Sequence, residues 1–358
     1  MELIWELKNL NYEPSVEVYK SLVKASRALS NINAVTRSLP NQKILLDIFL
    51  LQEARKSSEI ENIVTTHDEV FSKSIENPHE WQRPSVKEVR NYVRAVTEGL
   101  VRLRENGIIS RRLIVEIQEI LLGNNAGFRR QAGTKLMNES TGEVVYIPPQ
   151  HPDQIENLMA DLIEFINNNE ANSLDPLIKA MIIHHQFESI HPFYDGNGRT
   201  GRMLIVLYLL QQELIELPLL YLSQYINKTK GDYYRHLQEI RMSHNYDNYL
   251  IYMLNGVEQI SIKTSTIIQH IRELMVGYKG IMRDSDVKNL YSHELLNNIF
   301  RYPYTRIEYV QRDLNVTRVT AKARLDNLVS LGLLRVEKQG KYLYYINQKL
   351  VNYIFAEE

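Results

Sequence analysis

The chain has 358 residues, of which 44% are hydrophobic and 24% charged, and its 42 Lys and Arg residues nearly balance 43 Asp and Glu residues. This composition is typical of a globular protein, and the near-zero net charge excludes a general electrostatic attraction to nucleic acid or anionic membranes. The lack of cysteine excludes disulfides, thiolate catalysis, zinc fingers and iron–sulfur clusters, so any metal must bind through oxygen and nitrogen ligands.

The sequence contains no recognisable targeting or membrane segment. The longest unbroken apolar run, residues 203–210, is far shorter than the roughly 20 residues that cross a bilayer as a helix. Residues 1–10 lack the basic region, apolar stretch and small-residue cleavage site of a secretory signal. These features predict a cytoplasmic protein with no membrane association.

Residues 1 to about 110 are expected to be entirely helical. Apolar residues recur at helical spacing, most clearly in residues 44–51. Pro78 and Pro84 indicate a loop, because proline removes a backbone donor and disfavours helix at the preceding residue, and a helix is expected to resume near Ser85. Residues 115–122 predict a further short helix that ends in the sequence GNNAG.

A small β-hairpin follows. Residues 134–137 and 144–147 are short β-prone runs that flank the turn-forming sequence NESTGE. Pro148 and Pro149 then end the second strand. The predicted hairpin therefore spans about residues 134–147.

Helical periodicity returns at Asp153 and continues through the middle of the chain. Further helices are expected at residues 177–189, 203–210, about 231–241, 246–255 and 258–275. The sequence GYKG at residues 277–280 is expected to break the last of them.

The final part of the chain has the element order of a winged helix-turn-helix. Three helix candidates, residues 294–300, 306–314 and 317–331, precede two alternating strands around a turn at residues 339–341. Nine basic and four acidic residues lie between positions 301 and 341. DNA binding is one reading, with base contacts from Thr317, Arg318, Thr320, Ala321 and Arg324 and phosphate contacts from Lys338 and Lys341. The alternative is a module for protein contacts or dimerisation.

Residues 191–202, with the sequence HPFYDGNGRTGR, concentrate the residue types that phosphate chemistry needs. Gly196 and Gly198 precede an apolar helix, and a glycine turn at a helix start forms a nest of amides that binds anions. Arg199 and Arg202 can hold phosphate oxygens through their guanidinium groups. Asp195 suits a divalent cation such as Mg²⁺. His191 is the natural base for a hydroxyl proton near neutral pH.

A transition-metal site is a weaker alternative. His184, Glu188 and His191 have roughly the spacing of one helix face, which is compatible with a zinc or iron site. In the competing interpretation His185 and Phe187 pack under the loop and Glu188 forms a local hydrogen bond.

Residues 191–202 match the motif HPFx(D/E)GNGRxxR without departure, and the chain thereby resembles the Fic family. Residues 128–130 (FRR), 147–149 (IPP) and 220–234 also resemble stretches of that family, so about residues 40–275 are similar to it. Fic proteins of this type transfer AMP from ATP to a side-chain hydroxyl of a target protein and release pyrophosphate. The resemblance therefore implies a protein adenylyltransferase with ATP as substrate and Mg²⁺ as cofactor.

Carried over residue by residue, the resemblance implies a role for each position of the motif. His191 would deprotonate the target Ser, Thr or Tyr, and Asp195 would hold Mg²⁺ against the phosphates. Arg199 and Arg202 would grip the outer phosphates. The remaining predicted nucleotide contacts are Asn197, which cradles the α-phosphate with the loop amides, and Gly196, Gly198, Thr200, Gly201, Tyr233 and Tyr234. The hairpin at 134–147 resembles the flap that docks the target by strand addition.

A second motif lies upstream. The sequence Ser57-Ser58-Glu59-Ile60-Glu61-Asn62 fits the pattern (S/T)xxxE(G/N) of the family's inhibitory helix, with Ser57, Glu61 and Asn62 at the fixed positions. A carboxylate that reaches Arg202 would occupy the guanidinium needed for the γ-phosphate. The alternative is an ordinary surface glutamate beside Arg55 and Lys56.

The expected architecture is mainly α: an N-terminal helical region (1–110) with the inhibitory helix at 57–62, a Fic core with a β-hairpin flap (111–275), and a C-terminal winged-helix domain (276–358). A homodimer and self-modification are further expectations from the family. Two alternatives stay open: a Fic enzyme that transfers another phosphate-containing group or removes AMP with Glu61, and a nucleotide-sensing DNA-binding regulator.

Overall fold

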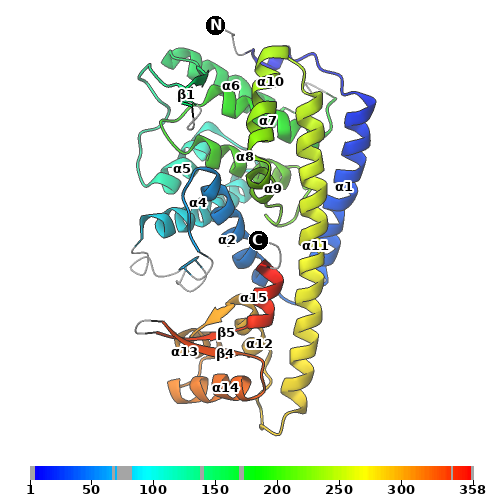
Figure 1. Cartoon of the computed structure of the whole chain (residues 1–358), viewed down its shortest axis with the longest axis vertical. Helices are drawn as coiled ribbons and strands as arrows, with labels where there is room; N and C mark the ends of the chain where they lie inside the picture. Colours follow the sequence, from blue (N-terminus) through cyan, green and yellow to red (C-terminus); the bar gives the residue numbers. More distant parts are fainter. Residues whose placement is uncertain are drawn as a thin grey trace.

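Two long helices form one side of the molecule in the computed structural model, which describes residues 5–66, 69–70, 83–137, 141–168, 173–339 and 342–355. Helix α1 (Val16–Arg37) lies along α11 (Asp247–Asp284), and α11 runs from the upper helical body to the C-terminal unit below it (Figure 1). A short 3-10 turn, η1 (Leu7–Asn9), precedes α1. None of the helices in the described ranges is long and apolar enough to span a membrane.

The centre of the upper body is the helix pair α7 (Pro176–Ile190) and α8 (Asn197–Gln211). Every residue from 199 to 209 is buried, which explains the unbroken apolar run at 203–210: this helix is covered on all sides. Helices α6 (Pro152–Asn167) and α10 (Lys230–Ser243) complete this part of the body. The pair α7 and α8 therefore offers a rigid frame for the turn between them.

The N-terminal region is helical, as predicted. It contains α2 (Lys43–Ile60), α4 (Pro84–Asn106) and α5 (Arg111–Leu122), and α2 packs against α4 and against α9 (Ser223–Lys228). Helices α4 and α5 end at glycines with left-handed backbone, Gly107 and Gly123, each at φ 71°. The predicted loop between Pro78 and Pro84 lies mostly outside the described residues.

The predicted hairpin is confirmed. Strands β1 (Leu136–Met137) and β2 (Val144–Tyr146) pair antiparallel, with Leu136 opposite Tyr146. Residues 138–140 of the turn lie outside the described ranges. The hairpin projects near the edge of the upper body (Figure 1).

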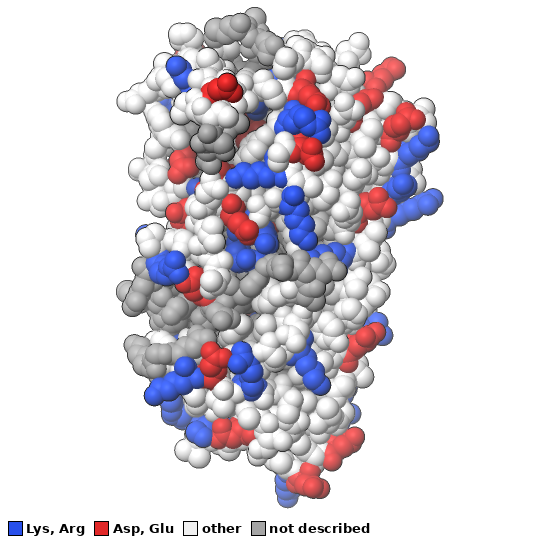
Figure 2. Space-filling model, in the orientation of Figure 1, with Lys and Arg blue, Asp and Glu red and all other residues white. Residues whose placement is uncertain are grey.

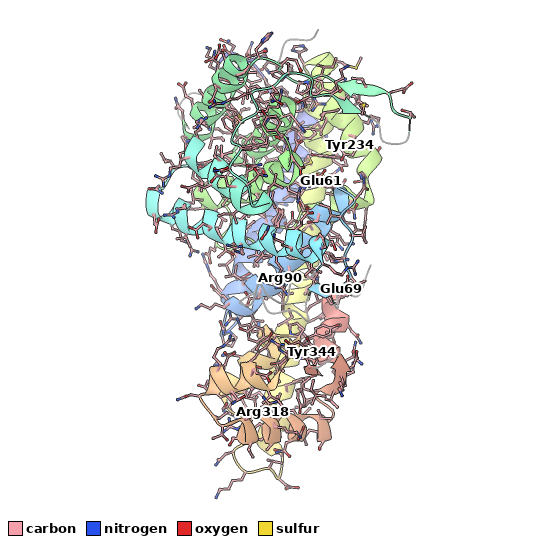
Figure 3. The ribbon with its side chains drawn as sticks, turned by 90° about the vertical axis from the view of Figure 1, so that its left-hand side faces the viewer. Glu61, Glu69, Arg90, Tyr234, Arg318 and Tyr344 are labelled. Carbon is pink, nitrogen blue, oxygen red and sulfur yellow. The ribbon has the colours of Figure 1, made fainter. Side chains whose placement is uncertain are left out.

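The C-terminal unit has the predicted order of three helices followed by a hairpin, with additional elements. In chain order it contains α12 (His293–Arg301), β3 (Tyr304–Thr305), α13 (Ile307–Leu314), α14 (Arg318–Ser330), β4 (Arg335–Gln339), β5 (Tyr342–Ile346) and α15 (Gln348–Phe355). The strands form an antiparallel sheet in the order β3-β5-β4. This order of elements agrees with the one expected for a winged helix-turn-helix. Figure 3 shows Arg318 on this lower unit and Glu61 within the upper body.

The predicted helix break at residues 277–280 is wrong, and so is the separation of residues 246–255 from 258–275. Helix α11 is continuous from Asp247 to Asp284 and crosses the predicted domain boundary at 275/276. Met275, Tyr278 and Met282 keep a buried helical stripe through the two glycines. The Tyr278 hydroxyl also donates to the carbonyl of Leu333 at 2.8 Å, so tertiary packing outweighs the low helix propensity of glycine.

Charged side chains of both signs are interspersed over the face shown in Figure 2. This distribution agrees with the formal net charge of −1.

Candidate active site

Residues 191–202 form the turn between α7 and α8 and the first turns of α8. His191 ends α7 with a φ of 49°, and Gly196 precedes α8 with a φ of 76°, a conformation that glycine adopts readily. The Asn197 amide closes this turn: its Oδ1 accepts from Phe193 N and its Nδ2 donates to Phe193 O, each at 2.8 Å. Asn197, predicted to contact the α-phosphate, therefore also fixes the shape of the loop.

The start of α8 has the geometry of an anion site, and the chain's own carboxylate lies over it. The first amides of a helix have no partner within the helix and carry the positive end of its dipole. A Cβ added to Gly198 would collide with Oε1 of Glu61. The predicted phosphate site at Gly196 and Gly198 is thus next to the Glu61 carboxylate. At position 198 only glycine leaves room for this carboxylate.

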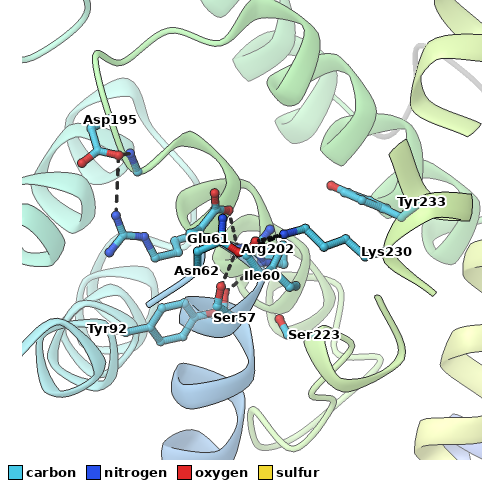
Figure 4. A network of polar contacts seen from close by, with 12 residues as sticks. Ser57, Ile60, Glu61, Asn62, Tyr92, Asp195, Arg202, Ser223, Lys230 and Tyr233 are labelled. Carbon is cyan, nitrogen blue, oxygen red and sulfur yellow. Dashed lines mark hydrogen bonds and ion pairs between the residues drawn. The ribbon is translucent and has the colours of Figure 1, made fainter. Parts of the chain in front are cut away.

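The end of α2 accepts hydrogen bonds from Arg202 (Figure 4). Its Nε donates to Oγ of Ser57 at 2.8 Å, and its Nη2 donates to the Ser57 carbonyl and to Oε1 of Glu61, both at 2.9 Å. The guanidinium is buried, and Glu61 is about one-third exposed. Burial raises the pKa of Glu61, but the nearby Arg202 charge outweighs it and lowers the pKa below its ordinary value. Glu61 is therefore ionised at neutral pH and occupies Arg202.

Other contacts hold the end of α2 in place. Glu61 is the C-cap of α2, and Asn62 follows with a φ of 62°. Lys230 Nζ donates to the Ile60 carbonyl at 2.6 Å. One helical turn before Ser57, the buried Glu53 accepts hydrogen bonds from the Tyr92 hydroxyl and from the backbone amide and hydroxyl of Ser223. The predicted inhibitory residues are thus anchored to α4, α9 and α10.

The surroundings of His191, the predicted base, keep its imidazole ring neutral. Burial lowers its pKa to about 4, with further lowering by the charges of Arg129 and Arg241. The ring is therefore neutral at pH 7. Its Nδ1 is buried, and a hydrogen bond with the Glu188 backbone only partly offsets the lowering of its pKa.

Arg129 connects the turn between α7 and α8 to the segment that follows the hairpin. Its Nε donates to the His191 carbonyl at 2.8 Å, and its backbone amide donates to the Pro192 carbonyl at 2.8 Å. Its Nη2 also donates to the Pro149 carbonyl, just after the hairpin. The buried Arg129 guanidinium thus links the chain just after the hairpin, at Pro149, to the backbone of the predicted base, His191.

The second strand of the hairpin is anchored to α7 in the same region. The Tyr146 hydroxyl donates to the Ser189 carbonyl at 2.9 Å. The Arg241 guanidinium stacks 3.8 Å from the centre of the Tyr146 ring, and its Nε donates to Ser189 Oγ at 3.1 Å. The second strand of the hairpin is therefore fixed to the end of α7, two residues before His191.

Arg199 and Arg202 have different partners. The buried Arg199 donates through Nη1 to Glu88 of α4 at 2.7 Å, and its Nη2 lies 3.6 Å from Oδ1 of Asp195. The Asp195 side chain is 73% exposed, and its Oδ1 also accepts from the Gly196 amide at 2.6 Å. A single exposed carboxylate beside an anion-binding helix start fits Mg²⁺, which takes one or two carboxylates together with substrate phosphates and water.

Tyr233 and Tyr234 lie at different depths. Tyr233 is buried, and its hydroxyl is 2.8 Å from Nε2 of His184. Tyr234 is 45% exposed, with its ring centre 5.2 Å from that of Tyr233. Of the two predicted nucleotide contacts, only Tyr234 is exposed to solvent.

Thr200 and Gly201 are buried in the first turns of α8, and Gly201 lies against α7. A Cβ on Gly201 would lie 2.7 Å from Oε1 of Glu188, so only glycine permits this close approach. Burial raises the pKa of Glu188 to about 7. The structure thus places both predicted contacts inside α8, where they are buried.

The described residues contain no cluster of three or more His, Cys, Asp or Glu side chains that could hold a metal. His184 bonds to Tyr233, and His185 Nε2 lies 3.3 Å from the Leu237 carbonyl. The alternative of a zinc or iron site at His184, Glu188 and His191 therefore receives no support from the geometry.

Sequence reasoning did not assign roles to four residues that build the site. They are Glu53, Glu88, Arg129 and Arg241. Residues 128–130 were noted for a resemblance alone. Each of the other three is at least 39 positions from its main partner in the chain, and no local pattern indicates such pairs.

The site combines a neutral histidine, an exposed carboxylate and two arginines around a helix N-terminus, which is the set of groups expected of an enzyme of the Fic type. Three family models match the chain: the Fic/DOC family N-terminal model at residues 19–101, the Fic/DOC family model at 108–209, and the C-terminal domain of SoFic-like protein adenylyltransferases at 274–350. The chain belongs to the Fic/DOC family.

Curated relatives agree with this family. A protein of Aquifex aeolicus named "Probable protein adenylyltransferase" is 29% identical over 187 residues, which cover 51% of this chain and 54% of the relative. The "Protein adenylyltransferase fic-1" of Caenorhabditis elegans is 30% identical over 91 residues, 25% of this chain and 16% of the relative. The chain thus spans about half or less of the length of these relatives.

Solved structures show the same fold. A Fic family protein from Desulfovibrio desulfuricans has a TM-score of 0.57 at 21% identity, covering 94% of this chain and 98% of that one. Fic-1 from Caenorhabditis elegans has a TM-score of 0.51 at 20% identity, covering 70% and 73%. At these identities the similarity concerns the fold alone.

Proposed function

We propose that the protein is an adenylyltransferase that transfers AMP from ATP to a hydroxyl of a target protein and is held inactive by Glu61. The observation that carries this proposal is the placement of the Glu61 carboxylate on Arg202, over the glycine-rich start of α8. A carboxylate at an anion site excludes or misplaces a phosphate. The curated relatives named as protein adenylyltransferases support the reaction class.

In the proposed reaction His191 accepts the proton of the target hydroxyl. The hydroxyl oxygen attacks the α-phosphorus of ATP, the bond between the α-phosphorus and its bridging oxygen breaks, and pyrophosphate leaves. With Glu61 displaced, Arg202 is released to bind the outer phosphates. Asp195 would hold Mg²⁺, which neutralises phosphate charge and helps to orient the leaving group.

The hairpin is proposed to dock the target protein. Its strands expose apolar side chains, with Met137 at 59%, Val144 at 46% and Val145 at 44% exposure. An extended target segment can add to such an edge through backbone hydrogen bonds. The anchoring of Tyr146 at Ser189 would hold that segment close to His191.

Label transfer tests the reaction. Glu61→Gly is incubated with a cell lysate and Mg²⁺, with ATP labelled on the α-phosphate in one sample and on the γ-phosphate in the other. Adenylyl transfer puts only the α label on protein. Label from the γ-phosphate that depends on Glu61→Gly, beyond what the lysate alone gives, would instead show phosphoryl transfer and would contradict the proposal.

The pH dependence of transfer should reflect the lowered pKa of His191. A base with a pKa of about 4 stays neutral as the pH falls through 6.5, the ordinary value for histidine. We therefore expect the rate for Glu61→Gly not to follow histidine protonation near 6.5, but to fall only as the pH approaches 4. The transfer rate is measured against pH with saturating ATP. A fall in rate centred near pH 6.5 would contradict the lowered pKa of His191.

Two further readings remain predictions. The same site could transfer another phosphate-containing group, or remove AMP with Glu61 positioning a water molecule, and product analysis of the label experiment separates these reactions.

DNA binding by the C-terminal unit is the other reading. Three of its basic residues are already paired with carboxylates: Arg318 with Glu308, Lys322 with Asp326 and Arg335 with Glu337.

A further inference from the structure

Arg199 lies between two carboxylates. Its side chain is only 3% exposed; Nη1 bonds to Oε2 of Glu88 at 2.7 Å, and Nη2 lies 3.6 Å from Oδ1 of Asp195. The first distance is that of a full hydrogen bond, and the second is that of a loose ion pair. Glu88 is therefore the main partner of this guanidinium.

A buried guanidinium requires a carboxylate partner, because an unpaired buried charge is costly. If Glu88 lost its charge, the nearest carboxylate would be Asp195, at 3.6 Å. Closing that gap would give Asp195 Oδ1 a charged donor in addition to the Gly196 amide at 2.6 Å. A carboxylate paired in this way is a weaker ligand for a cation.

We propose that Glu88 is a positioning residue that keeps Arg199 off Asp195 and thereby leaves the Asp195 carboxylate available to Mg²⁺. The inference rests on the proposed function, because it assumes that Asp195 is the metal ligand. Glu88 acts through Arg199 and does not touch the substrate itself.

The surroundings of Glu88 fit this role. Glu88 and Asp195 both line an open pocket of about 390 Å³, together with Lys87, Asn91, Gln118 and Tyr194. The Glu88 side chain is 35% exposed, so its replacement leaves no buried cavity. Both carboxylates are thus reachable from solvent, while the guanidinium between them is not.

The test measures how strongly Mg²⁺ and ATP promote each other's binding. Calorimetry gives the dissociation constant of ATP in EDTA and in Mg²⁺ for the full-length Glu61→Gly protein, and the ratio of the two is the coupling between metal and nucleotide. In Glu61→Gly/Glu88→Gln we expect this ratio to fall about tenfold, which is about 1.4 kcal/mol and lies at the lower end of what a hydrogen bond to a charged group contributes. The dissociation constant in EDTA should change little.

Two further variants serve as controls. Glu61→Gly/Glu88→Asp keeps the charge and should retain most of the coupling. Glu61→Gly/Glu98→Gln removes an exposed glutamate of the same helix, which pairs with Arg102 at 3.1 Å, and should match the parent. A purely structural role of Glu88 would lower the melting temperature but leave the coupling ratio unchanged.

The outcomes separate this inference from the proposed function. An unchanged ratio in Glu88→Gln, or a ratio that rises, overturns the inference; a rise would mark Glu88 as a competitor for phosphate. If the Glu88→Gln substitution lowers the coupling although the Glu61→Gly parent transfers no label, that result supports the inference about Glu88 and contradicts the proposed adenylyltransferase function. A parent without any coupling contradicts the metal site at Asp195 and the role of Glu88 with it.

Discussion

Replacement of Glu61 by glycine is expected to increase both ATP affinity and label transfer by about 10- to 100-fold, because hydrogen bonds to charged groups are worth about 1.5–3 kcal/mol. In the wild-type protein Arg202 is bound to Glu61 and Ser57, and an incoming phosphate must displace the carboxylate. Glycine removes this competitor. The hydrogen bonds from Arg202 to Ser57 stay, so the guanidinium keeps its position for the phosphate.

The matched control is Glu59→Gly. Glu59 lies in the last turn of α2 and pairs with Lys56 at 3.1 Å, and its side chain is about as exposed as that of Glu61. The Glu59→Gly substitution places a glycine in the same end of α2 but leaves the Glu61–Arg202 pair intact. Equal activation by Glu59→Gly would mean that loosening of the helix, rather than loss of the carboxylate, releases the enzyme.

Replacement of His191 by alanine in the Glu61→Gly protein is expected to reduce transfer by at least about 100-fold, the usual contribution of a general base. ATP affinity should stay within about twofold, because the phosphate contacts come from the α8 start and from Arg202. Rates and calorimetric affinities of the two proteins are compared directly. A lower transfer rate with an unchanged ATP affinity is the result expected when the lost side chain is the general base.

His151→Ala provides the control for His191. His151 is exposed at the start of α6, and its loss should leave transfer unchanged. Retention of most activity by the His191 variant would assign proton removal to another group. A large loss of ATP affinity would instead show that His191 supports the loop.

Short-range patterns predicted most of the site. The segment 191–202 contains the predicted base, the predicted metal ligand, the glycine turn and both arginines within twelve positions, so the sequence alone indicates its chemistry. The inhibitory pattern at Ser57–Asn62 is equally local. The structure adds that Glu61 is the C-cap of α2 and that its carboxylate reaches the space above Gly198.

The unpredicted part depends on contacts between distant residues. Glu88 is 111 positions from Arg199, and Glu53 is 170 positions from Ser223; both read as ordinary charged residues of helical segments. The continuity of α11 through residues 277–280 also depends on partners elsewhere, since Tyr278 bonds to the Leu333 carbonyl. Local propensity favoured a break there, and packing against the C-terminal unit prevented it.

The most direct test of the central claim is the transfer of label from α-labelled ATP to protein by wild type, Glu61→Gly and Glu61→Gly/His191→Ala, measured side by side with Mg²⁺ present. The account predicts weak labelling by wild type, strong labelling by Glu61→Gly and none above background by the double variant. Equal labelling by wild type and Glu61→Gly, or labelling that persists without His191, would contradict it.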